Sequence, residues 1–174
     1  LREAVGKAAK LQPIEVTETV QTQILEFIAG RLKVVLNDVG YKYDVVEAVL
    51  AEQSANPAKS VEAVKQLQAW VEREDWNTIL PGYARCVRII RSAKLDAEKL
   101  KVNPKKFIEE EEKNLYNEIQ RNVKAQPSSV DEFLNSVVKL IPSINAFFDK
   151  VLVMAEDEKV KQNRLALVGQ VANL

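Results

Sequence analysis

The chain has 174 residues, of which 47% are hydrophobic, and these values suit one globular domain covering residues 1–174. Its 25 basic and 25 acidic residues cancel, so a site for nucleic acid or membrane has to be a local patch. The sequence has no histidine and one cysteine, which excludes an internal disulfide, the usual zinc sites and His-dependent catalysis. We therefore expect no catalytic residue, no metal and no cofactor in this chain.

The ends and the apolar runs of the chain give a second expectation. No apolar stretch is long enough to span a bilayer, and the chain begins with neither Met nor a signal peptide. These features indicate a soluble, intracellular fragment of a longer chain, with no membrane partner.

The pattern of apolar residues predicts an all-α fold. Apolar residues recur three and four positions apart, and the chain has only 5 glycines and 6 prolines. We expect a bundle of about seven or eight helices and no strand. The expected helices cover residues 2–11, 17–39, 43–52, 57–73, 76–93, 105–125, 130–153 and 156–173.

Local signals mark several helix ends. Pro57 suits the first turn of a helix, and Ser129 with Glu132 has the spacing of a capping box ahead of an apolar run. Pro81 and Pro142 fall inside helical patterns, so each predicts a kink or a break. Residues 96–106 have little apolar content and are expected to form an exposed connection.

The fifth expected helix carries a row of basic residues. Residues 76–95 include no acidic residue, and the basic ones recur every three positions, at Arg85, Arg88, Arg91 and Lys94. At about 100° per residue, the apolar positions fall on the other side of this helix. Such a face can contact successive phosphates or stack on unstacked RNA bases. The alternative is a solvated face that pairs with carboxylates, such as the four glutamates at 109–112.

Three further side chains are interpreted as structural. Cys86 lies on the apolar side of its expected helix, and no histidine exists to activate it as a nucleophile. Trp70 and Trp76 flank a charged turn and could stack a base, but core packing is the simpler expectation.

The last expected helix places a charge among apolar residues. Arg164 falls in the middle of an apolar stripe, with Asp157 seven residues earlier on the same side and Asp149 at the margin of the preceding helix's stripe. A core-facing guanidinium needs carboxylate partners to offset its desolvation. We expect Asp149, Asp157 and Arg164 to form a structural ion-pair cluster that docks the last two helices.

Two sequence blocks carry a resemblance to a known family. Residues 147–165 read FFDKVLVMAEDEKVKQNRL and closely resemble the C-terminal signature of the β subunits of bacterial-type, two-subunit glycyl-tRNA synthetases. Residues 27–34, FIAGRLKV, followed by DVVEAV at 44–49, look like an upstream block of the same family. The chain departs from the family pattern at Gly30, where Asp is expected, at Leu152 in place of Met, and at Arg88 in place of Asn.

The resemblance implies an α-helical anticodon-binding domain of the DALR type, although the Asp-Ala-Leu-Arg tetrapeptide itself does not occur. It implies that this chain recognises the anticodon region of glycine tRNA and does not itself catalyse. ATP and Mg would belong to the parent ligase, whose other partner is its α subunit in an assembly of two α and two β subunits. The implied location is the bacterial cytoplasm, or an organelle if the parent is eukaryotic.

On this interpretation the RNA-binding residues are Arg85, Arg88, Arg91 and Lys94, together with Lys33, which points away from its apolar neighbours. Arg31, which apolar residues surround, is expected to be structural. Two alternatives stay open at this point. One is the equivalent domain of arginyl-tRNA synthetase, and the other is a helical protein-interaction scaffold in which the Arg85 face is paired.

Overall fold

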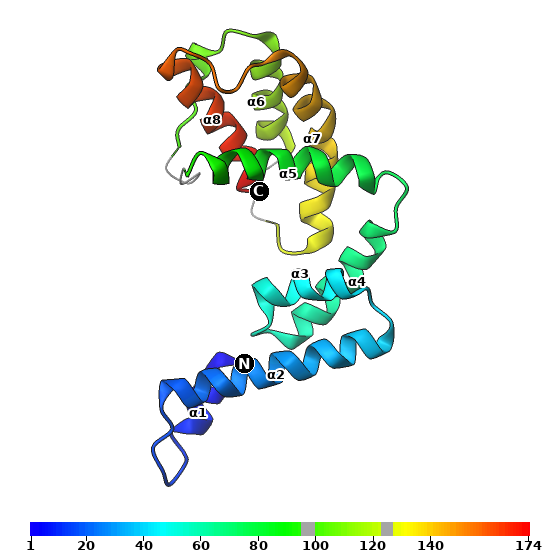
Figure 1. The fold of residues 1–174 in the computed structure, drawn as a ribbon, viewed down its shortest axis with the longest axis vertical. Helices are drawn as coiled ribbons and strands as arrows, with labels where there is room; N and C mark the ends of the chain where they lie inside the picture. The colour runs from blue at the N-terminus through cyan, green and yellow to red at the C-terminus, as the bar shows by residue number, and fades with distance from the viewer. Residues whose placement is uncertain (95–99, 123–126) are drawn as a thin grey trace. The chain divides into compact units, whose positions relative to one another are not determined.

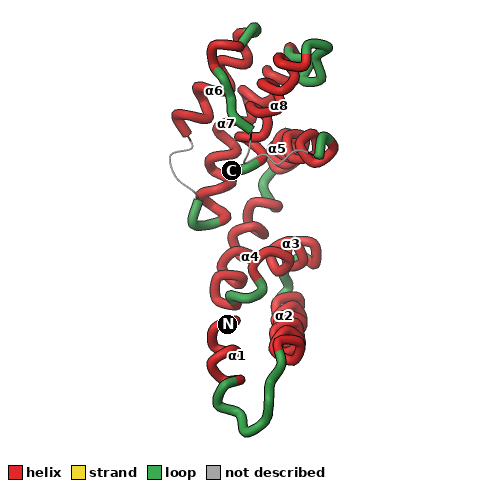
Figure 2. The backbone as a smooth tube through the Cα atoms, turned by 90° about the vertical axis from the view of Figure 1, so that its left-hand side faces the viewer, coloured by secondary structure: helices red, strands yellow, loops and turns green. Residues whose placement is uncertain are grey.

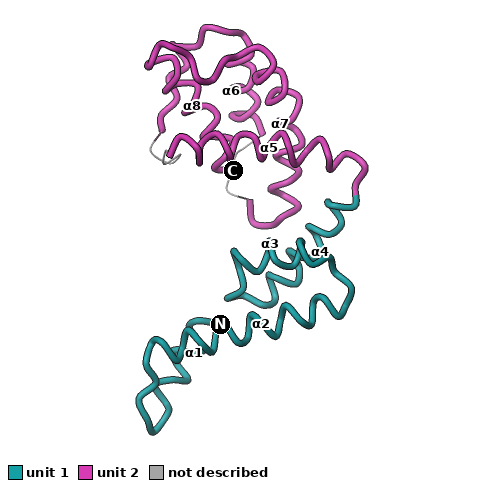
Figure 3. Tube along the Cα trace, in the orientation of Figure 1, with its two compact units in different colours: residues 1–72 teal, residues 73–174 magenta. Residues whose placement is uncertain are grey.

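The computed structural model describes residues 1–94, 100–122 and 127–174, and within these ranges the chain is helical without a strand (Figures 1 and 2). The all-α prediction is confirmed. Contacts divide the chain into two compact units, residues 1–72 (unit 1) and residues 73–174 (unit 2), drawn in Figure 3. A single cooperative domain over residues 1–174 stays a prediction.

Unit 1 contains α1 (Arg2–Ala9), α2 (Glu18–Val39), α3 (Tyr43–Gln53) and α4 (Pro57–Val71). The helix ends follow local chemistry: Thr17 caps α2 by accepting from the Val20 amide, and Gly40 ends it with φ of 103°, a left-handed conformation that suits glycine. The core of this unit consists of Leu36, Val45, Val46, Val49, Ala63, Val64 and Trp70.

One side of α2 is apolar and exposed. The exposed residues recur with helical spacing and are Val20, Ile24, Phe27, Val34 and Val35, with Phe27 69% exposed. Arg31 lies between them and is itself exposed, and its structural role stays a prediction. Because α2 has apolar residues on both sides, its sequence does not show which side faces the core.

Unit 2 contains α5 (Trp76–Ser92), a 3-10 turn η2 (Pro104–Lys106), α6 (Glu110–Asn122), α7 (Val130–Lys150) and α8 (Glu158–Ala172). Helices α7 and α8 each pack against α5 and α6, as Figure 1 shows. Every residue from Asn163 to Gly169 is buried, so this part of α8 is covered on all sides and lies in the core of the unit. Gly82 lets α5 and α7 approach closely, since a Cβ there would lie 2.9 Å from Ile141 Cδ1.

Most predicted helix ends lie within a few residues of the observed ones. The expected capping box is present in a shifted form: the N-cap Ser129 accepts from the Glu132 amide, and the Glu132 carboxylate accepts from the amide of Ser128, the residue before the N-cap. Helices α5 and α7 each continue through their proline, so neither Pro81 nor Pro142 breaks its helix.

Two helix ends differ from the prediction. α6 begins at Glu110 instead of residue 105, after the η2 turn, and α7 ends at Lys150, after which residues 151–157 form a corner before α8. The predicted end of α6 at residue 125 lies outside the described residues. The same holds for positions 96–99 of the expected connection.

A buried ion pair joins α8 to α6. Arg164 Nε donates to Glu112 Oε1 at 3.1 Å, and the two side chains are only 8% and 1% exposed. Arg164 Nη1 also donates to the carbonyl oxygen of Leu152, at 3.0 Å. The second carboxylate oxygen of Glu112 accepts from the amides of Ile108, at 2.8 Å, and Glu109, at 2.7 Å. The carboxylate therefore caps the start of α6 and pairs the guanidinium at the same time.

The partners expected for Arg164 are wrong. Asp149 is exposed, and Asp157 is the N-cap of α8, where it accepts from the amides of Lys159, at 2.8 Å, and Val160, at 3.0 Å. These backbone hydrogen bonds lower the pKa of Asp157. The free amides of the helix start bind Asp157, which leaves Arg164 to the carboxylate of Glu112, 52 residues away.

A second long-range contact starts from the neighbouring residue of α8. The buried Asn163 side chain accepts from the Asn103 amide at 2.7 Å and donates to the Asn103 carbonyl at 3.2 Å. One side-chain amide thus satisfies both backbone groups of a residue in the segment before η2. Two consecutive residues of α8 therefore hold the segment around Asn103, the start of α6 and the corner after α7.

We predict that Arg164→Met and Glu112→Gln both lower the melting temperature, by more than about 10 °C. Each leaves one buried member of the pair without its ionic partner, and such losses typically cost about 3 to 5 kcal/mol. The measurement is thermal unfolding followed by circular dichroism.

The exposed Asp149 provides the matched control, because Asp149→Asn removes the same charge at a position with no bond to Arg164. We expect it to shift the midpoint by less than about 2 °C. A large drop in the melting temperature of Asp149→Asn, together with no drop for Glu112→Gln, would instead support Asp149 as the partner of Arg164.

Candidate nucleic-acid interface

Helix α5 presents a cationic outer face. Arg85, Arg88 and Arg91 are all exposed, whereas Ile79, Cys86 and Ile90 on the other side are buried. The arginines are exposed because their three-residue spacing places them on the side of the helix opposite the buried apolar residues. Lys94 follows the helix, is exposed and has a positive φ of 53°. The three arginines of α5 are therefore exposed opposite its apolar stripe, and Lys94 is exposed beyond the helix end.

Two of the four glutamates expected as partners of this face are engaged elsewhere. Glu110 pairs with Lys113 at 2.9 Å, and Glu112 pairs with the buried Arg164. Within residues 1–94, 100–122 and 127–174, no carboxylate lies within 4.0 Å of the guanidinium of Arg85, Arg88 or Arg91. In the described part of the chain the face thus keeps its positive charge uncompensated.

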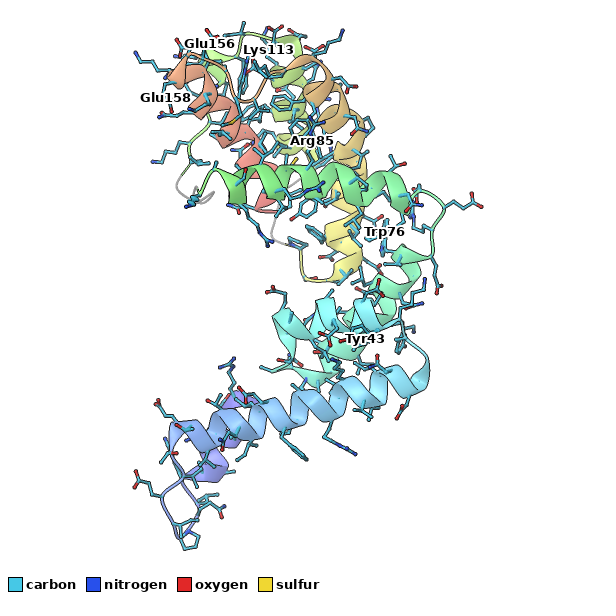
Figure 4. All side chains as sticks on the ribbon, viewed as in Figure 1. Tyr43, Trp76, Arg85, Lys113, Glu156 and Glu158 are labelled. Atoms are coloured by element: carbon cyan, nitrogen blue, oxygen red, sulfur yellow. The ribbon has the colours of Figure 1, made fainter. Side chains whose placement is uncertain are left out.

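Arg85 is oriented by an aromatic ring. Its guanidinium carbon lies 4.0 Å from the centre of the Phe148 ring, a cation–π contact between α5 and α7. The Phe148 ring meets Phe147 edge to face, with ring centres 5.3 Å apart, and Phe147 is fully buried. The buried Phe147 ring therefore supports the half-exposed Phe148 ring, and Phe148 in turn supports the exposed guanidinium of Arg85. The position of Arg85 on α5 is labelled in Figure 4.

A depression opens beside this stack, and we call it the corner pocket. Its volume is about 420 Å³, and its lining residues are Arg85, Ile89, Phe148, Asp149, Lys150, Val151, Leu152, Val153 and Met154. The backbone after α7 is not helical, so side chains alternate: Val151 and Val153 are buried, whereas Leu152 and Met154 are 69% and 57% exposed. Sequence reasoning missed this pocket because it continued α7 to residue 153, although the alternation at 151–154 was a usable signal.

Lys33 lies in a different environment from the arginines. It belongs to α2 in unit 1, forms an ion pair with Glu47, and its Nζ donates to Tyr43 Oη at 3.3 Å. The same ammonium lies 4.7 Å from the centre of the Tyr43 ring. Hydrogen bonding to Glu47 and then to Tyr43 raises the pKa of Lys33. Its charge is partly compensated within its own unit, unlike that of the arginine face.

A second basic depression lies between the η2 region and α8. Its volume is about 340 Å³, and it is lined by Leu100, Lys101, Asn103, Lys106, Lys159, Gln162, Asn163 and Ala166. The sequence showed the lysines near residue 100 only as part of an exposed connection. Asn163, which binds Asn103, brings that segment beside α8 and so gathers Lys101, Lys106 and Lys159 around one depression.

The described residues contain no group of three His, Cys, Asp or Glu side chains placed to hold a metal ion. Among the same residues, none of the helices has the length and apolar character needed to cross a membrane. Cys86 is 1% exposed and donates to the Gly82 carbonyl at 3.7 Å, as a structural thiol does.

Unit 2 is an all-α unit with an exposed arginine face on α5, and sequence comparison gives its family. The DALR anticodon binding domain family matches residues 79–174, more than half of the chain and nearly all of unit 2. The chain therefore belongs to the DALR anticodon-binding domain family.

Individual relatives are similar over most of the chain. The glycine–tRNA ligase β subunit of Moorella thermoacetica is 32% identical over 172 residues, which are 96% of this chain and 24% of that protein. The β subunit from Myxococcus xanthus is 36% identical over 160 residues, covering 87% of this chain and 22% of that protein. A chloroplastic/mitochondrial glycine–tRNA ligase of Arabidopsis thaliana is 29% identical over 170 residues, 96% of this chain and 16% of that protein. The chain thus spans about a quarter or less of these relatives.

We predict that Cys86 resists alkylation in the folded protein. Burial raises the pKa of its thiol from 9.0 to about 12, so at pH 8 the reactive thiolate is on the order of 1000-fold scarcer than in the unfolded chain. Iodoacetamide labelling followed by mass spectrometry should show slow modification in buffer and fast modification in denaturant. Equal rates in both conditions would contradict the buried, structural assignment.

Proposed function

We propose that this chain binds the anticodon region of glycine tRNA as part of a glycine–tRNA ligase β subunit. The observation that carries the proposal is the exposed face of Arg85, Arg88 and Arg91, which has no carboxylate partner among the described residues and lies inside the family match. The relatives named as glycine–tRNA ligases supply the identity of the tRNA and disfavour the arginyl-tRNA synthetase alternative.

Recognition would rest on two kinds of contact. Arg88 and Arg91, with Lys94 beyond the helix end, would bind phosphates of the anticodon stem and loop, which fix the position of the RNA without reading its sequence. Arg85, held over Phe148, would offer a planar cation to an unstacked base. A net charge of zero is compatible with this role, because a local patch suffices when other contacts in a large assembly add affinity.

The chemistry of the parent enzyme would take place outside this chain. ATP with Mg and the activation of glycine would belong to the rest of the ligase, which includes an α subunit in an assembly of two α and two β subunits. The location would be the bacterial cytoplasm, or an organelle for a parent of the plant type, since relatives of both kinds are similar to this chain.

A second candidate role concerns unit 1. The exposed apolar residues of α2, with Phe27 at 69% exposure, favour a contact with another part of the parent protein. This role would accompany RNA binding in unit 2, because the two surfaces belong to different units.

We predict that Arg88→Ala weakens binding to a fluorescently labelled glycine anticodon stem-loop. Loss of one phosphate contact should lower affinity several-fold and reduce the slope of log affinity against log salt by about 0.7 to 0.9. Fluorescence anisotropy at several salt concentrations measures both quantities.

Arg121→Ala is the control, because Arg121 is exposed on α6 and pairs with Glu118 at 2.7 Å. It should leave both affinity and slope unchanged. The proposal is overturned if the wild-type chain binds the stem-loop no better than an anticodon-swapped copy and Arg88→Ala matches the wild type.

A further inference from the structure

The corner pocket has a stacking surface on one side. The Arg85 guanidinium covers the Phe148 ring at 4.0 Å, and Arg85 is itself exposed, so part of its planar group stays open to a ligand. Guanidinium planes are common stacking partners for bases that have left a helical stack. Because Phe147 is buried behind Phe148, the surface is held in place before any ligand arrives.

The other side of the corner pocket is apolar and open. Leu152 and Met154 line it and are 69% and 57% exposed, while the buried Val151 and Val153 hold the backbone between them in place. A single exposed apolar residue needs no explanation, but two of them beside a supported cation form a surface that a planar group can cover. The volume of about 420 Å³ is within the usual range of small-ligand sites.

The polar groups of the corner pocket give it a hydrogen-bonding preference. Asp149 offers only acceptors, and the next residue, Lys150, offers only donors. The pairing edge of cytosine is complementary to this arrangement, because its N4 amino group donates while N3 and O2 accept. Uracil carries an oxygen at the same position as the amino group, and that oxygen would face the carboxylate of Asp149.

We infer that the corner pocket binds one unstacked anticodon base and that Asp149 selects cytosine there by accepting from its N4 amino group. The inference rests on the proposed function, which supplies the RNA. Guanine also presents donors to a carboxylate, and adenine offers an N6 amino donor beside its N1 acceptor, so the lining alone does not separate these bases from cytosine. Glycine codons begin with two guanines, however, so every glycine anticodon shares two cytosines. A pocket that serves all glycine tRNAs therefore reads cytosine.

The test measures binding of the 174-residue chain to labelled anticodon stem-loops in which each shared cytosine is changed, one at a time, to uracil or guanine. For one of the two positions, wild type should bind cytosine about tenfold more tightly than uracil. In Asp149→Asn, whose amide can donate to the uracil oxygen, this preference should fall to about twofold or less. Thermal unfolding of Asp149→Asn, measured in parallel, should give the wild-type midpoint and so show that the variant is folded.

Glu156→Gln is the matched control, because Glu156 is an exposed carboxylate of the same corner that does not line the pocket (Figure 4). It should keep the full preference for cytosine. An unchanged preference in Asp149→Asn, or binding of guanine as tight as that of cytosine, overturns the inference while the salt-dependent effect of Arg88→Ala leaves the proposed function standing. Absence of any stem-loop binding by wild type overturns both.

Discussion

The desolvation of Arg164 is the constraint on which unit 2 depends. A guanidinium that is 8% exposed has lost nearly all its water, and only a close carboxylate and well-placed acceptors can offset that loss. Glu112 supplies the carboxylate and the carbonyl of Leu152 supplies an acceptor, so one side chain fixes α8 against α6 and against the corner after α7. The pairing geometry therefore sets the arrangement of three segments at once.

Scaffold and candidate site meet at the same residue. The carbonyl of Leu152 binds the buried Arg164, while the side chain of Leu152 lies exposed in the corner pocket. Phe147 and Phe148 repeat this division, with one ring in the core and the next beneath Arg85. The block at residues 147–165 thus combines two tasks that the sequence alone presents as one motif. Some of its residues hold the fold, and others line the surface.

Local patterns explain what could be predicted. The arginine face of α5 and the capping box at Ser129 depend on residues three positions apart, and such spacings can be read directly from a sequence. The burial of Arg164 followed in the same way from its apolar neighbours. Its partner did not, because Glu112 lies 52 residues away in a run of four glutamates that resembles an ordinary solvated surface. The exposed side of α2 was missed since that helix is apolar on both sides.

The long separation of the α8 contacts has a consequence for how unit 2 forms during synthesis. Asn163 and Arg164 bind groups 60 and 52 residues earlier in the chain, so α6 and the segment before it leave the ribosome well before their partners exist. Until α8 emerges, the carboxylate of Glu112 can only cap its own helix, and the apolar surfaces of α5, α6 and α7 lack the helix that covers them. The nascent unit therefore stays open while the intervening residues are translated, and chaperone binding would compete with its closure during that time.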